Sequence, residues 1–350
     1  MDKLPTAAAL DPAALLAGLV PTRRFGRASF ETYEPDRRYP SQEHALHRMR
    51  NFSATIDRRP SRLRFLNRER AASRAIYLDG GYGVGKTHLL ASIYHATAGQ
   101  RYYLSFAELA YTIGRLGMQP ALEAFAGVSL VCIDEFELDD VAQTRMAAMF
   151  LRQVLEQRTM HIVTTSNTLP SDLGQGRFAA DAFQRDIGDI AAAFEIVSID
   201  GEDYRHRRWD ELARPRLLDA AELERQFTID VANERVLLDW PKLATQLEQV
   251  HPVHYGQIAS RLEALYVQGL EPIADQAVAL RLVHFVDKLY DQEVRLSVSS
   301  TVPLTELFSA SYRHGGYEKK YRRCLSRLHE LLSESGSPVG EGIAGQVELG

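Results

Sequence analysis

The sequence is poor in cysteine, and it contains no long uninterrupted hydrophobic run. The two cysteines, Cys132 and Cys324, are far apart and each falls within an apolar pattern, so we expect two buried thiols rather than a disulfide or a metal site. Such thiols suit a reducing compartment. No apolar run is long enough to span a bilayer, and Asp11-Pro12 interrupts the Ala- and Leu-rich residues 7–20. We therefore expect neither a membrane segment nor a signal peptide, and we expect a cytoplasmic location.

A strong excess of charge of either sign is also absent. The formal net charge is −5 for 350 residues, which gives no global reason to expect nucleic acid as a partner. The densest basic stretch is 58–74, where seven arginines stand against a single acid, Glu69. This stretch is either a solvated face or a site for an acidic partner or a nucleic-acid backbone. Phe65 is its only aromatic residue, so stacking on bases has little support.

The most informative stretch is a glycine-rich loop between an apolar run and a helical pattern. From Gly80 to Thr87 it fits G-x-x-x-x-G-K-[ST], the phosphate-binding pattern of P-loop proteins. Its glycines let successive backbone N–H groups point into one hollow, and the N-terminus of the following helix favours an anion there. Lys86 can reach the β- and γ-phosphates, and the Thr87 hydroxyl can ligate Mg²⁺. We predict that ATP is bound by eight consecutive residues: Gly80, Gly81, Tyr82, Gly83, Val84, Gly85, Lys86 and Thr87.

A second stretch supplies two acids at the end of a buried strand. Residues 128–133 are almost continuously apolar, and Asp134 and Glu135 follow them, about fifty residues after the glycine loop. In a P-loop hydrolase the first acid holds Mg²⁺, and the second orients the attacking water in line with the γ-phosphate. We assign these roles to Asp134 and Glu135. The acids just beyond, Asp139 and Asp140, are better suited to cap the next helix.

A third strand-like run, residues 161–166, ends in the amide side chain of Asn167. Ligands of open α/β sheets bind outside the carboxyl ends of the strands. At such a position Asn167 can hydrogen-bond the attacking water or a phosphate oxygen. The alternative is an ordinary turn residue before Pro170. We expect Lys86, Glu135 and Asn167 to act together in catalysis.

Three arginines are candidates for the positive charge that raises phosphoryl-transfer rates by roughly 10³–10⁵. Arg177 and Arg185 flank an expected helix after Asn167, and Arg177 is our choice for reaching the phosphates of a neighbouring subunit. Arg327, in the last expected helix, is a candidate sensor within its own chain, with an exposed helix arginine as the alternative. Arg177 and Arg185 have nearby acids as alternative partners: Asp172, Asp181, Asp186 and Asp189.

The middle of the chain alternates between strand and helix patterns. The strands are short, nearly continuous apolar runs, which is typical of a parallel sheet buried on both faces. The predicted class is therefore α/β with right-handed crossovers. The expected strands are 75–79, 101–105, 128–134, 161–166 and 195–199.

On either side of this region the pattern differs. A helix is expected from about Ser41, preceded by four aromatic residues that either line an adenine pocket or seal the edge of the core: Phe25, Phe30, Tyr33 and Tyr39. Beyond residue 200 we expect strands at 234–240 and 293–299. The helices expected there are 219–228, 241–250, 254–268, 273–290 and 317–332.

We divide the chain into four parts on these patterns. Residues 1–73 form an N-terminal segment and helix that lead into the core, and 74–205 form the P-loop core. Residues 206–332 form a smaller, mainly helical lid domain. The Ser- and Gly-rich tail, 333–350, is expected to be disordered.

The P-loop, the strand ending in Asp-Glu and the strand ending in Asn, in that order, resemble an AAA+ ATPase. More specifically, the chain resembles the ZapE family of cell-division ATPases, which includes mitochondrial relatives. The Asp-Tyr-Arg and Ser-Arg-Leu pieces are not generic to P-loop proteins and carry this resemblance most strongly. The matching segments are Ser29-Phe30-Glu31-Thr32-Tyr33, the loop 80–87, Asp134-Glu135-Phe136, Thr165-Ser166-Asn167 with Leu169-Pro170, Arg177-Phe178, Asp203-Tyr204-Arg205, Leu289-Tyr290-Asp291, Val294-Arg295-Leu296 and Ser326-Arg327-Leu328.

The resemblance implies an AAA+ sheet of order 5-1-4-3-2, a helical lid and Mg²⁺-dependent ATP hydrolysis. It also implies a role at the division site, acting on the cytokinetic ring, whereas mitochondrial members are linked to protein quality control. The chain departs from the family pattern after Asn167, where 171–193 is acidic, rich in alanine and lacks a Phe-Leu-Pro after the arginine. This departure weakens the assignment of Arg177. We expect the side chains of Tyr82 and Val84 to matter little, because backbone groups bind the phosphates.

Two other functions compete with a partner-remodelling ATPase. A nucleic-acid-associated ATPase resembling helicase loaders would use the arginines of 58–74, and its DNA affinity would fall with salt. A nucleotide-gated adaptor would bind ATP without turnover, although the intact Asp134-Glu135 pair argues against it. The expected partner is a protein, with a homo-oligomer if an arginine is supplied in trans.

Overall fold

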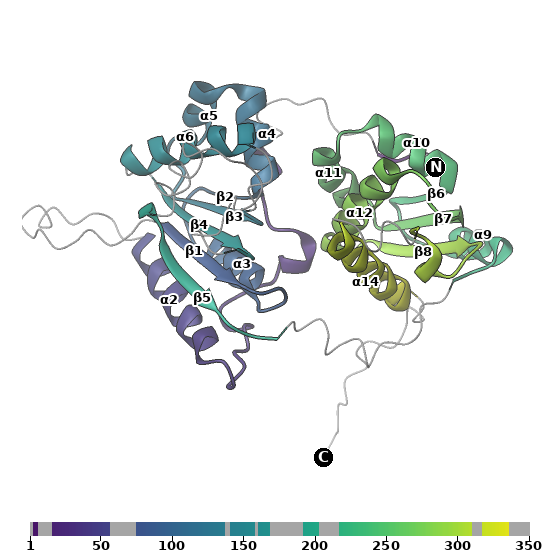
Figure 1. Cartoon of the computed structure of the whole chain (residues 1–350), viewed down its shortest axis with the longest axis horizontal. Helices are drawn as coiled ribbons and strands as arrows, with labels where there is room; N and C mark the ends of the chain where they lie inside the picture. The colour runs from purple at the N-terminus through teal and green to yellow at the C-terminus, as the bar shows by residue number, and fades with distance from the viewer. Residues whose placement is uncertain are drawn as a thin grey trace, which may run out of the picture. The chain divides into compact units, whose positions relative to one another are not determined.

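The computed structural model describes residues 3–5, 16–56, 75–136, 141–157, 160–168, 192–202, 217–309 and 317–335. The chain separates into two compact units, whose elements are labelled in Figure 1. The first, which we call the P-loop unit, is Ala8–Trp209. The second, which we call the C-terminal unit, is Asp210–Gly350 together with Met1–Ala7.

The P-loop unit is built on a five-stranded parallel sheet. Its strands are β1 Ala75–Gly80, β2 Arg101–Ser105, β3 Leu130–Asp134, β4 His161–Ser166 and β5 Glu195–Ile199. The strand order is β2-β3-β4-β1-β5, which is 5-1-4-3-2 read from the other edge, so the predicted AAA+ sheet is confirmed. The strand that precedes Asn167 therefore lies between the strand of the glycine loop and the strand of Asp134.

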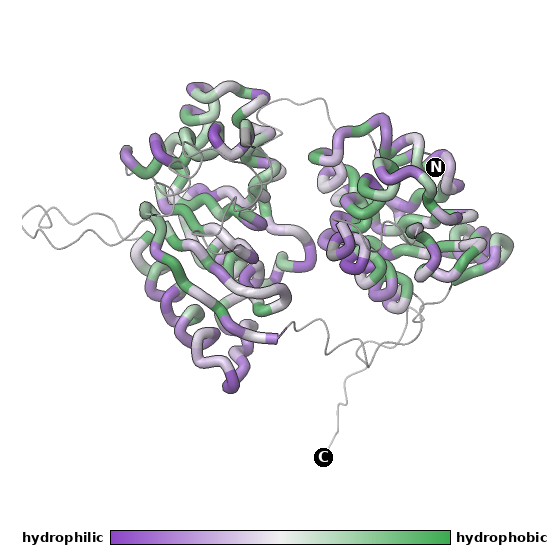
Figure 2. The backbone as a smooth tube through the Cα atoms, viewed as in Figure 1, coloured by the Kyte–Doolittle hydropathy of each residue, from purple (hydrophilic) through white to green (hydrophobic). Residues whose placement is uncertain are grey.

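Helices cover both faces of this sheet. Strand side chains alternate between two apolar cores, so Ile76 and Leu78 face the core of α2 and α3, while Ala75 and Tyr77 face the core of α4, α5 and α6. Figure 2 shows the strands as hydrophobic along most of their length, as expected for a sheet buried on both sides. The helices are η1 Arg23–Phe25, α2 Pro40–Ile56, α3 Lys86–Ala96, α4 Phe106–Leu116, α5 Met118–Ala124 and α6 Val141–Gln157.

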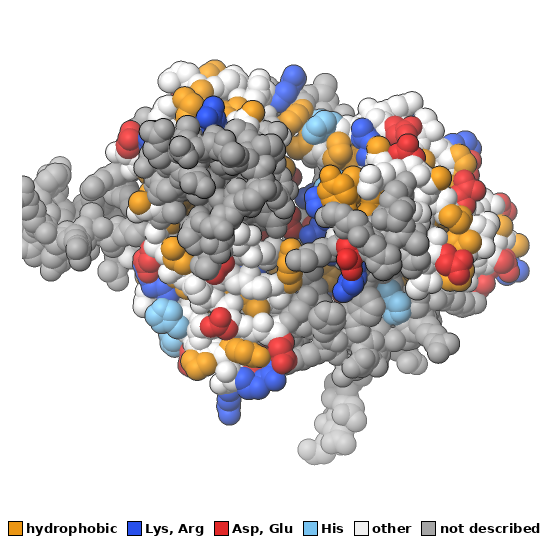
Figure 3. Space-filling view, in the orientation of Figure 1, with side chains coloured by type: hydrophobic (Ala, Val, Ile, Leu, Met, Phe, Trp, Pro, Cys, Tyr) orange, Lys and Arg blue, Asp and Glu red, His pale blue; other side chains and the backbone are white. Residues whose placement is uncertain are grey.

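Local signals account for the helix boundaries in this unit. Helix α4 begins at a capping box, in which Ser105 Oγ accepts from Glu108 N and Glu108 Oε2 accepts from Ser105 N, and it ends at Gly117, with φ +84°. The predicted helix near Ser41 is α2, on which Glu43, His44 and His47 are exposed. Figure 3 shows histidine side chains on the surface at the lower left, in the region of this helix. Its buried face is the predicted stripe: Gln42, Ala45, Leu46, Met49 and Phe52.

The C-terminal unit is also α/β. Three parallel strands lie in the order β6-β7-β8: β6 Arg235–Asp239, β7 Ala264–Leu270 and β8 Arg295–Ser300. Three of its helices, α9, α10 and α12, begin at aspartates whose carboxylates accept from helix backbone N–H groups: Asp219, Asp239 and Asp275. The helices are α9 Ala220–Ile229, α10 Trp240–Gln249, η4 Pro252–His254, α11 Tyr255–Ser260, α12 Gln276–Asp291, η5 Leu304–Glu306 and α14 Glu318–Ser335.

The core of the C-terminal unit includes a residue from the very start of the chain. One face of its sheet packs on α9, and the other packs on α10, α11, α12 and α14. Leu4 is buried in the second of these cores, and its N–H donates to Gln246 Oε1 at 2.8 Å. The chain therefore begins in the C-terminal unit, runs through the P-loop unit and returns.

One predicted element of this unit is wrong. The helix expected at 254–268 ends at Ser260 as α11, and Ala264–Leu270 is the central strand β7. A central strand buried on both faces gives a continuous apolar run, which periodicity does not distinguish from a buried helix. The unit is helix-rich as predicted, but it is organised around a sheet that includes this unforeseen strand.

The final predicted helix extends to Ser335, and the rest of the expected tail, 336–350, lies outside the described residues. In the described parts of the chain, no helix combines the length and apolar composition needed to cross a membrane.

Candidate active site

The glycine loop joins the end of β1 to the start of α3, as the sequence predicts. Gly85 caps α3 with φ +91°, and a Cβ there would lie 2.5 Å from the Tyr33 ring. Gly80 has φ +155°, and a Cβ there would lie 2.3 Å from the Ile199 carbonyl oxygen. At both positions the backbone and its neighbours leave no space for a side chain, so glycine is required.

Lys86 lies in the hollow of this loop and is largely buried. Its ammonium group donates to the carbonyl oxygens of Gly80 at 2.8 Å and Gly81 at 2.5 Å, and to Asn167 Oδ1 at 2.9 Å. The structure therefore brings together the predicted loop lysine and the predicted strand-end amide. The bond between them exists because β1 and β4 are neighbours whose carboxyl ends meet at one edge of the sheet.

Asp134 lies at the same edge, at the end of β3. Its Oδ1 accepts from Thr87 Oγ1 at 3.3 Å and also from Thr165 Oγ1, while its Oδ2 accepts from Tyr103 Oη at 2.8 Å. Three hydroxyl groups from three different elements thus surround one carboxylate. The Thr87 hydroxyl and the Asp134 carboxylate, both predicted Mg²⁺ ligands, are oxygen donors of the kind that this cation prefers.

Glu135 follows directly and has an exposed side chain. Its backbone adopts φ +51°, which is uncommon for a residue other than glycine. The turned backbone lets the Glu135 N–H donate to Thr165 Oγ1 at 3.0 Å, and the Phe136 N–H donates to the Thr165 carbonyl oxygen at 2.7 Å. The neighbouring strand therefore fixes the direction in which the chain leaves β3.

A segment before the sheet packs on the glycine loop from the outside. Tyr33 is buried, and its hydroxyl donates to the Val84 carbonyl oxygen at 3.1 Å. His88 Nε2, in the first turn of α3, lies 3.0 Å from both Ser29 O and Thr32 Oγ1. Burial raises the pKa of Tyr33 to about 12, so its hydroxyl remains a donor at physiological pH. Burial also lowers the pKa of His88, against the opposing effect of its bond to Ser29.

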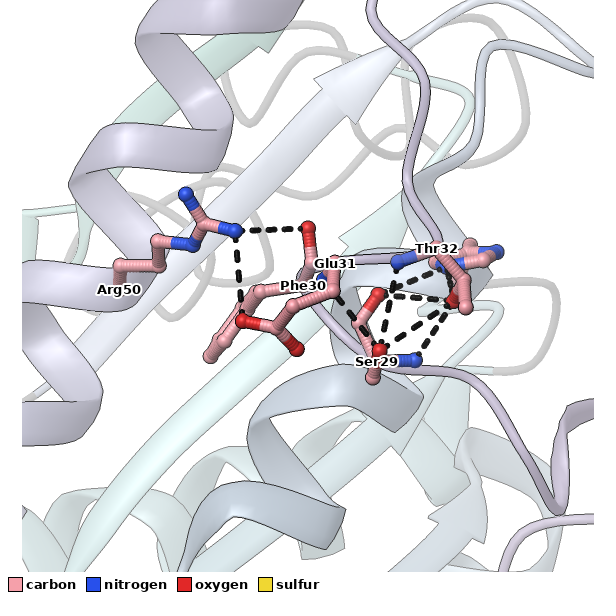
Figure 4. Close-up of polar contacts among 6 residues, drawn as sticks. Ser29, Phe30, Glu31, Thr32 and Arg50 are labelled. Carbon is pink, nitrogen blue, oxygen red and sulfur yellow. Dashed lines mark hydrogen bonds and ion pairs between the residues drawn. The ribbon is translucent and has the colours of Figure 1, made fainter.

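Hydrogen bonds and an ion pair hold this segment in place. Ser29 and Thr32 form a compact turn in which the Thr32 hydroxyl donates to Ser29 O and accepts from Ser29 N (Figure 4). Arg50, on α2, donates to the Phe30 carbonyl oxygen at 3.0 Å and pairs with Glu31 at 3.4 Å. Phe30 and Tyr33 therefore seal the core beside the glycine loop, which was one of the two predicted alternatives, and the adenine pocket stays a prediction.

The Val84 side chain has a packing role that the sequence analysis did not give it. Val84 is buried in the core of α2 and α3. A Cβ added at Gly201 would lie 3.0 Å from Val84 Cγ1, and one added at Gly80 would lie 3.2 Å from Val84 Cγ2. Val84 thus packs against the end of β5, whereas Tyr82 is exposed.

The structure does not test the roles predicted for the arginines. Arg177, Arg185 and the arginine-rich stretch 58–74 lie outside the described residues. Arg327 belongs to the C-terminal unit, where it is buried on α14. It pairs with Asp287 at 2.5 Å, and its guanidinium lies 4.9 Å from the centre of the Tyr290 ring. Its role as a sensor stays a prediction.

The sequence analysis assigned no role to three residues that contact the predicted site: His88, Tyr103 and Thr165. A weak signal existed for Thr165, because it belongs to the run that ends in Asn167. His88 follows the loop motif directly, at a position the motif leaves open. Tyr103 has no sequence signal, since only the pairing of β2 with β3 brings it to Asp134.

Comparison with known proteins identifies the group to which this site belongs. A model of the AFG1-like ATPase family matches residues 13–214 and 209–336, which together make up most of the chain. The chain belongs to this family. It is an ATP-hydrolysing P-loop ATPase with the AAA+ fold, as the resemblance implied.

Relatives of this AFG1-like ATPase are distant in sequence. The Escherichia coli K12 protein named cell division protein ZapE is 25% identical over 299 residues, which cover 75% of this chain and 78% of that protein. Lactation elevated protein 1 homolog B of Danio rerio is 24% identical over 315 residues, which cover 72% of this chain and 60% of that protein.

Similar solved structures include the crystal structure of DnaI, which is 18% identical with a TM-score of 0.41 and covers 53% of this chain and 96% of that chain. The crystal structure of the DnaC helicase loader is 20% identical with a TM-score of 0.36 and covers 51% and 99%.

Proposed function

We propose that this AFG1-like ATPase uses Mg²⁺-dependent ATP hydrolysis to remodel a protein partner during cell division. The observation that carries the catalytic part is the convergence of Lys86, Asp134 and Asn167 at the carboxyl ends of three neighbouring strands. The division role is supported by its relative in Escherichia coli, which is named as a cell division protein. We place the protein in the cytoplasm, which suits two cysteines that are free and buried.

In this proposal the loop residues hold the nucleotide and the strand ends act on its γ-phosphate. Backbone N–H groups of 80–87 face the phosphates, and the Lys86 ammonium exchanges a carbonyl partner for phosphate oxygen. Asn167 accepts from the Lys86 ammonium and keeps it oriented, and it would lie close enough to contact the same phosphate. The Glu135 carboxylate orients the attacking water, because it follows Asp134 at the edge where the phosphates would lie.

The Mg²⁺ ion would be held by Thr87 and Asp134, whose oxygens lie 3.3 Å apart. Their hard oxygen donors fit this cation, which usually keeps several waters and takes only one or two protein ligands beside the phosphates. When bound, Mg²⁺ neutralises charge on the phosphate oxygens. The protein's contribution is to hold the hydroxyl and the carboxylate next to each other.

Two variants test this assignment. Lys86→Ala should abolish nucleotide binding or turnover. Glu135→Gln should bind ATP with near wild-type affinity and hydrolyse it very slowly, because the water is no longer polarised. Binding is measured with a fluorescent nucleotide and turnover by phosphate release. Normal turnover in Lys86→Ala would remove the P-loop assignment, and equal loss of binding and turnover in Glu135→Gln would make that acid structural.

The partner role is tested with the same trapped variant. Glu135→Gln loaded with ATP should hold the division-ring protein of its host in a complex that the ADP-loaded form does not make. Wild-type enzyme with ATP should change the sedimentation of ring polymers. A complex indifferent to the bound nucleotide, or polymers indifferent to ATP hydrolysis, would contradict the remodelling role while leaving the ATPase assignment intact.

Completion of the site by a neighbouring subunit is tested through protein concentration. Turnover per subunit should rise with concentration in the wild type and should stay low throughout in Arg177→Ala. Turnover that is flat and indifferent to Arg177 would contradict the assignment of Arg177. Arg185→Ala serves as the matched comparison on the same segment.

A further inference from the structure

Thr165 is a hydrogen-bonding hub between the two acids of the site. Its hydroxyl donates to Asp134 Oδ1 and accepts from the Glu135 N–H at 3.0 Å. Its carbonyl oxygen accepts from the Phe136 N–H at 2.7 Å. The hydroxyl proton therefore has one defined direction, because the N–H occupies the acceptor side of the oxygen and the carboxylate takes its proton.

Tyr103 holds the other oxygen of the same carboxylate. It lies near the end of β2, is largely buried, and donates to Asp134 Oδ2 at 2.8 Å. The two strands that flank β3 thus each supply one hydroxyl, one for each carboxylate oxygen. A carboxylate with a single partner can rotate about its terminal bond, whereas one held at both oxygens has a fixed plane.

The backbone conformation of Glu135 also depends on Thr165. A residue with φ +51° occupies a less favourable region unless its surroundings compensate. The bonds from Glu135 N and Phe136 N to Thr165 provide this compensation. Thr165 therefore acts on where Asp134 points and on where Glu135 leaves the strand.

We propose that Thr165 and Tyr103 are positioning residues for the Asp134–Glu135 pair. Thr165 fixes the orientation of both acids, and Tyr103 fixes the orientation of Asp134 alone. The inference rests on the proposed function, in which Asp134 helps to hold Mg²⁺ and Glu135 orients water. It goes further by assigning the orientation of these acids to the hydroxyl groups of two residues that the catalytic proposal itself does not use.

The test uses variants that remove a hydroxyl and little else. Thr165→Val keeps a β-branched side chain, and Tyr103→Phe keeps the ring. Each has a matched control on its own strand. The Thr164 hydroxyl is buried without a hydrogen-bond partner among the described residues, so Thr164→Val is its control. Within the described residues the Tyr102 hydroxyl accepts from Gln100 Nε2 at 3.0 Å in an exposed contact, so Tyr102→Phe is its control.

Three quantities separate positioning from packing: nucleotide affinity in EDTA, the Mg²⁺ concentration at half-saturation of tight nucleotide binding, and kcat. A fluorescent ADP analogue reports the first two without turnover. Both test variants should keep wild-type affinity in EDTA and need about tenfold more Mg²⁺, because loss of an outer partner of a metal ligand costs about 10–100-fold in metal affinity. Thr165→Val should also lower kcat by at least tenfold, whereas Tyr103→Phe should change kcat little at saturating Mg²⁺.

Thr165→Ser restores the hydroxyl and should restore both the Mg²⁺ midpoint and kcat, even if Thr165→Val folds poorly. The proposal is overturned if the test variants match their controls in the Mg²⁺ midpoint. It is equally overturned if affinity in EDTA falls as much as affinity in Mg²⁺, because that pattern is a packing defect. The wild-type midpoint tests the proposed Mg²⁺ dependence by itself, so failure of the positioning role is distinguishable from failure of the proposed function.

Discussion

The two units contain parallel sheets of the same kind, but they use the carboxyl ends of their strands differently. In the P-loop unit these ends carry Lys86, Asp134 and Asn167, which converge on one region. In the C-terminal unit the Asp239 carboxylate at the end of β6 caps α10, and the Ser299 hydroxyl near the end of β8 accepts from Gly269 N at 2.9 Å. The comparison shows that parallel topology offers a place for a site, while the polar groups decide whether that place binds a ligand.

The units also place their charges differently. The P-loop unit holds its polar cluster at the edge of the sheet. The C-terminal unit buries one between α12 and α14, where Asp287 pairs with Arg323 at 2.6 Å and with Arg327 at 2.5 Å. Tyr290, beneath Arg327, donates to Glu330 Oε2 at 2.9 Å. We expect the edge cluster to govern nucleotide binding and the buried cluster to govern stability.

Of the changes predicted here, removal of Asp287 should produce the largest difference between the effect on the stability of the C-terminal unit and the effect on nucleotide binding. Asp287→Ala leaves two arginines in a buried site without their shared carboxylate, which costs about 3–5 kcal/mol in the free energy of unfolding. Trp240 is buried in the same core, so its fluorescence in a Trp209→Phe background reports urea unfolding of this unit. Nucleotide affinity should stay unchanged.

The control is Arg322→Ala on the same helix, whose exposed pair with Glu318 contributes about 0–1 kcal/mol. If Asp287→Ala instead leaves stability intact and alters ATP affinity, the buried cluster serves the nucleotide site. That result would favour Arg327 as a sensor and would remove the distinction drawn between the two clusters.

Leu4 tests whether the start of the chain belongs energetically to the C-terminal unit. Leu4→Ala removes a buried side chain from that core and should cost about 2 kcal/mol, the lower end of the range for such truncations. The Trp240 transition should move to lower urea, while nucleotide affinity at the P-loop stays the same. Lys3→Ala, at an exposed neighbouring position, is the control. A loss of nucleotide affinity as large as the loss of stability would indicate that Leu4 stabilises the P-loop unit instead.

The contribution of Asp287 should depend on pH. Burial raises the pKa of its carboxyl group, but Arg327 and Arg323 lower it by more, so the net shift is downward from 3.8. A folded-state pKa below the unfolded value gives stabilisation that is complete well above pH 3.8 and is lost as the pH falls through the folded-state pKa. The difference in unfolding free energy between wild type and Asp287→Ala should therefore be largest near pH 7 and narrow below pH 3.8. A difference that widens on acidification would reverse the sign of this coupling.

The sequence predicts the site of the P-loop unit well because each of its main parts is encoded by a short, contiguous stretch of residues. The glycine loop, the Asp-Glu strand end and the Asn strand end each follow an apolar run, and parallel pairing then brings strand ends together. Tyr103 and Thr165 were not predicted as site residues, because their roles depend on which strands are neighbours and on their register.

The C-terminal unit is harder to predict for the same physical reason. Strand β7 was predicted as helix, since its apolar run has no alternation when both faces are buried. The contact of Leu4 with the core joins residues more than two hundred positions apart, and no local pattern encodes it. Motifs report chemistry that is contiguous in sequence, whereas packing across the chain must be read from the structure.

The smallest effect is expected at the contact of Tyr33 with the glycine loop. Tyr33→Phe keeps the ring against Gly85 and removes the hydrogen bond to the Val84 carbonyl oxygen. This loss should destabilise the ordered loop by about 1 kcal/mol and so weaken nucleotide affinity about fivefold. Tyr39→Phe, on the same segment, should bind nucleotide as the wild type does. Because Tyr33 acts on the loop backbone, its loss should weaken binding equally with and without Mg²⁺, which distinguishes it from Tyr103. A loss of nucleotide affinity confined to Mg²⁺-containing solutions would instead indicate that Tyr33 acts through Asp134.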